Sequence, residues 1–195
     1  MKNKLIIIIG VVFVSLLALS ECVDIKQIYD SYGYNNIIIT REPNQSFLGL
    51  SKGLKLRVLH VQPQSETTGN WKRYYHYSGN KALDAPTENY VRSMGLQENL
   101  EDSEYTLDVT VERFDFLAYR YQMQAWADLR VSLKDSKGCE VFLQEDVSAT
   151  SILEFGLNDS QQAIDEVRCA VMNEAYTQAL EQINWNRIAS FLRTE

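Results

Sequence analysis

The sequence predicts an α+β fold in which an antiparallel sheet carries a long C-terminal helix packed on one face. Apolar and polar residues alternate along most of residues 105–147, which is typical of strands with one buried and one wet face. Between residues 164 and 183, apolar residues instead recur at spacings of three and four, which is typical of a helix with one apolar side. Because the sheet and the helix each need cover for one face, we expect them to pack together.

Three strands and one helix are expected before residue 100. The strand-forming runs are residues 36–40, residues 54–61 and the aromatic segment 71–77, separated by loops that contain Pro, Asn or Gly. Pro86 suits the first turn of a short helix that continues to Met94 and that Gly95 would end.

The alternating region predicts a meander of three strands. Residues 105–112 form the first, residues 121–134 the second, and residues 141–147 the third, with a turn at Asp135-Ser136-Lys137-Gly138. A register that sets apolar beside apolar residues pairs Leu133 with Val141 and Val131 with Leu143.

The helix that covers this sheet is expected to begin between Asn158 and Ser160 and to extend for about 24 residues. Its apolar stripe consists of Ile164, Val167, Val171, Ala175, Ala179 and Ile183. A final short helix carries Trp185, Ile188, Phe191 and Leu192.

The first 21 residues have the features of a signal peptide. Lys2 and Lys4 precede an apolar run over residues 5–19, whose helical length of about 22 Å falls short of the roughly 30 Å hydrocarbon core of a bilayer. The sequence is compatible with two alternative cleavage sites. Cleavage after Ser20 would release a chain that begins at Glu21.

The second cleavage site makes Cys22 the first residue. Leu19-Ser20-Glu21-Cys22 resembles the lipobox of bacterial lipoproteins, in which that cysteine carries the acyl chains, although Glu21 replaces the usual Gly, Ala or Ser. Cys22 is then the lipidation site, residues 22–36 are the anchor and tether, and residues 37–195 are a single α+β domain. Several acyl chains would make membrane attachment stable.

Without residues 1–21 the chain keeps 17 basic and 25 acidic side chains, a formal charge of −8. Such a surface repels phosphate backbones, so nucleic acid is not an expected partner. With Cys22 assigned to lipid, Cys139 and Cys169 remain as an even pair in an oxidising compartment. They form either one disulfide or two free thiols.

No catalytic residue, metal site or cofactor is predicted. Gly49-Leu50-Ser51-Lys52-Gly53 fits the G-x-S-x-G string, but a nucleophile elbow needs a strand before it and a helix after it, and here a strand follows. His60 and His76 stand singly on predicted strands, without the spacing of a zinc site.

Two segments are candidates for partner binding. Trp126 interrupts the polar face of its strand, and Phe114 and Phe142 are expected on that same face, where they would form a docking patch. Lys72 and Arg73 lie in an aromatic strand that can dock an acidic partner or accept another strand. The alternative is that Trp126 is covered by the N-terminal strands and that segment 71–77 is a half-buried strand.

The order of these features resembles small periplasmic lipoproteins of Gram-negative bacteria, namely the YajG-like lipoproteins and the auxiliary lipoproteins of ABC-type transport systems. The resemblance rests on strand 105–114, hairpin 121–147, helical run 163–192 and the segment 71–77 followed by Asp84-Ala85-Pro86. It implies attachment to the inner leaflet of the outer membrane and a protein partner in the cell envelope.

The expected function is that of a non-enzymatic lipoprotein, an adaptor or stabiliser of a membrane-associated lipid-transport or envelope-assembly complex. The alternative is a soluble periplasmic or secreted module that holds a small apolar ligand between sheet and helix.

Overall fold

A computed structural model describes residues 43, 46–47, 53–61, 73–76, 81–96, 103–119, 121–156 and 158–193, all of which belong to one compact unit, Asn36–Glu195. The signal peptide, Cys22, the tether, the strand expected at residues 36–40, Ser51 and Lys72 lie outside the described residues, so the predictions made for them stay predictions.

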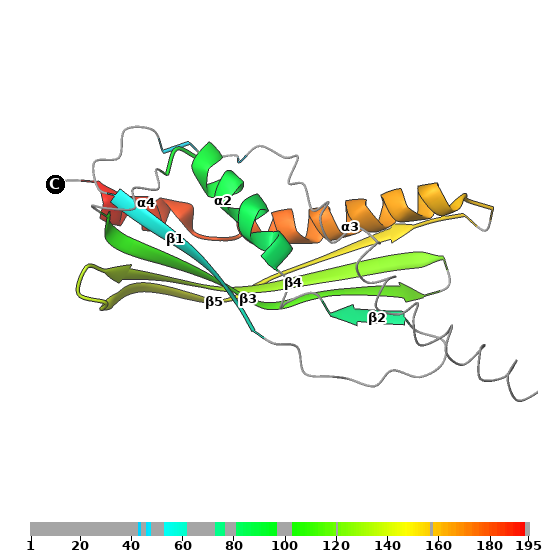
Figure 1. Ribbon diagram of the computed structural model, residues 1–195, viewed down its shortest axis with the longest axis horizontal. Helices are drawn as coiled ribbons and strands as arrows, with labels where there is room; N and C mark the ends of the chain where they lie inside the picture. The colour runs from blue at the N-terminus through cyan, green and yellow to red at the C-terminus, as the bar shows by residue number, and fades with distance from the viewer. Residues whose placement is uncertain are drawn as a thin grey trace, which may run out of the picture. The chain divides into compact units, whose positions relative to one another are not determined.

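Five strands form one sheet in the order β1-β3-β4-β5, with β2 added beside β3 (Figure 1). Their bounds are β1 Gly53–His60, β2 Arg73–His76, β3 Ser103–Tyr119, β4 Gln122–Asp135 and β5 Glu140–Glu154. All pairs are antiparallel except β1 with β3, which are parallel. The predicted α+β class and the meander β3-β4-β5 are confirmed, and the strands extend further than the alternation indicated.

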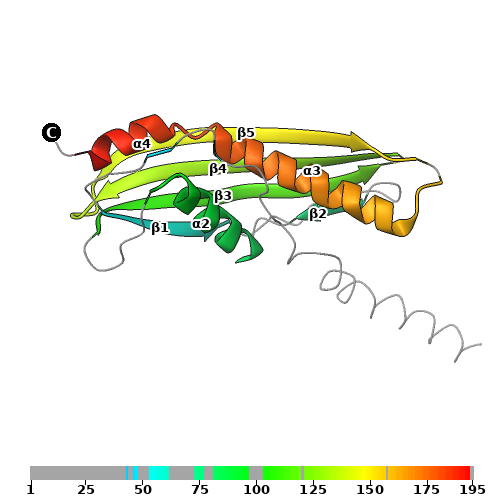
Figure 2. The same ribbon diagram turned by 90° about the horizontal axis from the view of Figure 1, so that it is seen from above.

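Three helices lie on one side of the sheet: α2 Asp84–Ser93, α3 Gln161–Glu181 and α4 Trp185–Leu192 (Figures 1 and 2). We call this side of the sheet the inner face and the opposite side the outer face. Capping residues mark the helix ends. The Ser160 hydroxyl accepts a hydrogen bond from the Ala163 amide and caps the N-terminus of α3. Gly95 follows α2 with a φ of 81°, a conformation that favours glycine.

The α3 stripe packs on β4 and β5 as predicted. Val171, Ala175 and Ala179 have no exposed surface, and Tyr176 beside them is equally buried. The Tyr176 ring meets the Phe114 ring edge-on, with their centroids 5.4 Å apart. Burial of this stripe stabilises the domain by roughly 1.5–3 kcal/mol for each large apolar side chain.

The predicted pairing between β4 and β5 is wrong by one residue. Leu133 lies opposite Phe142 and Val131 opposite Gln144, because β5 has one extra residue, Val141, between the partners of Leu133 and Lys134. A second extra residue follows between Leu129 and Val131, where two β5 residues stand opposite one β4 residue. Asp146, at this bulge, has a φ of 58°. An extra residue reverses which side chains face inward, so Leu143 turns to the outer face and is exposed.

A second irregularity, in β3 between Val111 and Arg113, shifts that strand in the same way. Phe114 therefore lies on the inner face, fully buried, and not on the outer face where unbroken alternation places it.

The parallel pairing of β1 with β3 requires a crossover connection, and α2 lies within it on the inner face. Strand β1 is consequently the edge of the sheet, next to α2. This placement creates the groove described below.

Candidate functional site

Trp126 lies on the outer face, opposite Asp115 of β3 and Thr150 of β5. The Arg113 guanidinium stands 5.0 Å from the centre of its ring, and Arg113 Nε also donates a hydrogen bond to the buried Asp115 carboxylate. Trp126 is half-buried, and a cation covers its ring. It is therefore part of a polar cluster.

The docking patch predicted from Trp126, Phe142 and Phe114 does not form. Trp126 is on the outer face, whereas Phe142 lies opposite the fully buried Leu133 and therefore on the inner face with Phe114. The two bulges account for the error, since each reverses the alternation on which the patch was predicted.

The second candidate segment for partner binding includes Arg73, which lies in strand β2. Its backbone pairs with that of Ala118, near the C-terminal end of β3.

A second polar cluster on the outer face surrounds Asp108. Its side chain is only 3% exposed and accepts hydrogen bonds from Arg57 Nε at 2.6 Å, Arg57 Nη2 at 2.7 Å and Lys134 Nζ at 2.9 Å. Burial alone would raise the pKa of Asp108, but the hydrogen bonds from Arg57 and Lys134 outweigh it and lower the pKa below its ordinary value of 3.8. The carboxylate thus ties the neighbouring strands β1, β3 and β4 together.

We expect Asp108→Asn to destabilise the domain by about 1–3 kcal/mol at neutral pH, because it weakens the hydrogen bonds to two cations. Since the pKa is lower in the folded than in the unfolded state, the contribution of Asp108 is complete above the unfolded value and is lost as pH falls through the folded one. Urea unfolding should therefore show the gap between variant and wild type narrowing as the pH falls from about 5 to about 3.

The control for this prediction is Asp165→Asn, which removes a carboxylate that pairs with Arg168 on the surface of α3. It should change stability by less than about 1 kcal/mol. A gap for Asp108→Asn that stays constant over this pH range would contradict the account of Asp108.

Two hydrogen bonds tie α2 to its surroundings. His60 Nε2 lies 2.7 Å from Asp84 Oδ1, which joins the end of β1 to the first residue of α2. The hydroxyls of Thr87 and Tyr176 are 2.7 Å apart in the core, and burial raises the pKa of Tyr176.

Within the described ranges, no group of three His, Cys, Asp or Glu side chains is placed to hold a metal ion.

Cys139 and Cys169 are both free in the structure, so a disulfide between them is not formed. Gln144 Nε2 donates to the carbonyl of Gln182, which places Gln144 beside the C-terminal end of α3. Cys139 stands in the turn just before β5, five residues from Gln144 and therefore at the end of the sheet that lies near Gln182. Cys169 lies thirteen residues before Gln182, about 20 Å back along the helix. A disulfide needs Cα atoms within about 7 Å of each other.

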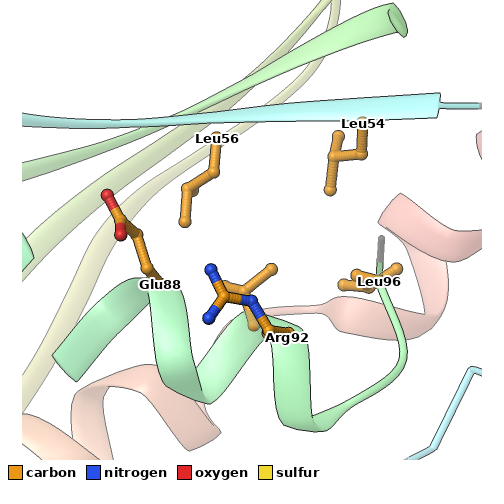
Figure 3. A pocket seen from close by; sticks show the side chains of 6 residues that line it. Leu54, Leu56, Glu88, Arg92 and Leu96 are labelled. Atoms are coloured by element: carbon orange, nitrogen blue, oxygen red, sulfur yellow. The ribbon is translucent and has the colours of Figure 1, made fainter. Parts of the chain in front are cut away.

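A groove lies between β1 and α2 (Figure 3). Its lining consists of Leu54 and Leu56 from β1, Glu88, Val91 and Arg92 from α2, and Leu96 just after the helix. The groove opens to solvent, with Glu88 and Arg92 reaching from the helix toward the strand. Its cavity volume of about 10 Å³ corresponds to roughly one water molecule, far below the roughly 300–1,000 Å³ of pockets that enclose a whole small ligand. The groove is therefore a shallow depression.

The groove was not predicted from the sequence. Alternation indicates that Leu54 and Leu56 share one face, and the spacing of four places Glu88 and Arg92 on one side of α2. No local signal shows that this strand and this helix lie together, because β1 pairs with a strand that begins more than forty residues after it ends.

No helix within the described part of the chain is long and apolar enough to cross a membrane. No known family model matches the chain, and no curated protein matches it.

The solved structures that are similar to this chain include the following two. One is a "putative lipoprotein" from Caulobacter crescentus, with a TM-score of 0.44 and 12% identity, which covers 70% of this chain and 89% of its own. The other is a Xanthomonas campestris protein of the DUF330 family, with a TM-score of 0.46 and 17% identity, which covers 78% of this chain and 93% of its own.

Proposed function

We propose that the protein is a non-enzymatic lipoprotein of the bacterial envelope, anchored to the outer membrane through Cys22. It acts in the periplasm as an adaptor or stabiliser of a membrane-associated complex for lipid transport or envelope assembly. The observation that carries the proposal is the basic and apolar N-terminal segment that ends at Cys22.

The polar clusters of the domain have a structural role. Asp108 joins three strands, His60 contacts the first residue of α2, and Thr87 bonds to Tyr176 in the core. Each of these groups holds elements of the fold together.

The packing of α3 gives no support to the alternative of an apolar ligand held between sheet and helix. Val171 and Ala175 have no exposed surface, and Tyr176 fills the space next to Phe114. A ligand there would have to displace side chains that are already closely packed.

We expect Cys22→Ser to abolish incorporation of an alkyne-labelled fatty acid and to move the protein from the membrane fraction to the soluble fraction. The physical reason is that acyl chains on the Cys22 thiol supply the membrane affinity. Cys139→Ser removes an exposed thiol of the domain and is the matched control, which should stay labelled and membrane-bound. Glu21→Ala restores a small residue before the cysteine and should speed processing.

A Cys22→Ser protein that remains in the membrane fraction would overturn the anchor. The adaptor role is tested separately by crosslinking the wild-type chain in its native host, where membrane-complex subunits should be recovered. Recovery of a bound apolar small molecule by native mass spectrometry, without any protein partner, would instead favour the ligand-binding module.

A further inference from the structure

Within the described ranges, no strand pairs with the side of β1 that faces away from β3. Strand β1 pairs only with β3 among the described strands, and the Val61 amide donates to the Val111 carbonyl at 3.0 Å. Because backbone groups alternate in direction along a strand, Leu56 and Val58 direct their N–H and C=O groups away from β3. Such an edge is a template for an added strand.

The groove lies directly beside this open edge. Leu56, whose backbone groups point outward along the edge, also contributes its side chain to the groove wall (Figure 3). A strand laid along β1 would therefore place every second side chain at the groove mouth, between Leu56 and the α2 residues Glu88 and Arg92. Because the groove is shallow, an aliphatic side chain would lie across its mouth, against Leu56.

The outer face of β1 selects the charge of the added strand. Lys55 and Arg57 alternate with the leucines and are exposed, and Arg57 remains 46% exposed although it pairs with Asp108. Lys55 has no ion-pair partner among the described residues. Opposite charges on neighbouring strands attract, so an acidic strand would be stabilised beside Lys55 and Arg57. A basic strand would be repelled, and an uncharged strand would have no electrostatic attraction to them. Lysine on an edge strand also discourages unselective pairing.

We propose that the groove between β1 and α2 binds an extended segment of a partner protein by strand addition. The segment alternates aliphatic residues, which face the groove, with acidic residues, which face Lys55 and Arg57. This inference rests on the proposed adaptor function for its choice of a protein partner, and it gives the chemistry of the partner's segment.

The test measures binding of a fluorescent seven-residue peptide of alternating Glu and Leu to the full-length chain in nonionic detergent. We expect anisotropy to report saturable binding, and amide exchange at Leu56 and Val58 to slow when the peptide is bound. A peptide with Lys in place of Glu should not bind measurably. A peptide N-methylated at alternate nitrogens should not bind either, because it cannot donate the strand hydrogen bonds.

Lys55→Glu should weaken binding about fivefold or more, because attraction to the acidic residues becomes repulsion. Lys137→Glu changes an exposed lysine in the β4–β5 turn and is the matched control, with no expected effect. Equal binding of the Lys peptide, unchanged binding to Lys55→Glu, or no binding at all would overturn the proposal. Self-association of the chain that Lys55→Glu abolishes would assign the edge to a second copy and also overturn it.

The same measurement on the Cys22→Ser chain separates the two proposals. Peptide binding does not need the lipid, so the groove proposal predicts unchanged affinity in that variant. Loss of the anchor without loss of binding, or the reverse, identifies which proposal fails.

Discussion

Replacing Val171 with aspartate is expected to cost the domain about 4 kcal/mol or more of unfolding free energy. Val171 is fully buried in the middle of the α3 stripe, against β4 and β5. A carboxylate at this position would lose its hydration and would be surrounded by apolar side chains of the sheet, which cannot form hydrogen bonds with it. Since a domain of this kind is stable by only about 5–15 kcal/mol, the variant should lose a large part of that stability and melt at a much lower temperature than the wild type.

Thermal unfolding followed by circular dichroism measures this effect. Ala170→Asp is the matched control, because Ala170 is the preceding residue of the same helix and is exposed. It should cost no more than about 0.7 kcal/mol, the difference in helix propensity. A melting temperature for Val171→Asp equal to that of Ala170→Asp would refute the packing of α3 on the sheet.

Local periodicity was sufficient to predict α3 and the meander. The stripe through Val171 and Ala175 is buried as expected, and β4 alternates without interruption, so that Ala125 and Leu129 are buried on its inner face. These elements repeat one pattern over many residues, and each repeat reinforces the assignment.

Bulges and non-local pairing were not predictable in this way. One extra residue near Arg113 and one near Asp146 each reverse the alternation beyond them, and neither position has a strong sequence signal. The parallel partner of β1 is equally hidden, because nothing near Gly53–His60 specifies β3.

The Asp108 cluster and the groove could not be predicted from the sequence for the same reason. Alternation places Asp108 on the wet face, yet cations from β1 and β4 enclose it so completely that it is buried. Arg57 and Lys134 are 51 and 26 residues away in sequence, so their convergence depends on strand order. The groove likewise requires the crossover that brings α2 beside β1.

The bulge in β3 leads to the second large effect, at Phe114. Phe114→Ala should destabilise the domain by about 3–5 kcal/mol, because it removes a fully buried ring and its edge-on contact with Tyr176. Unbroken alternation would put this ring on the outer face, where truncation costs much less. Urea unfolding of the variant therefore measures the consequence of one inserted residue.

Trp126→Ala is the matched control, an aromatic truncation on the outer face of the neighbouring strand. Trp126 is half-buried, and its stacking with Arg113 is worth about 0.5–1 kcal/mol at an exposed site, so its loss should cost clearly less than the loss of Phe114. The reverse order of the two costs would mean that β3 keeps its alternation through Arg113. In that case Phe114 would share the outer face with Trp126, and the apolar patch expected from the sequence would exist.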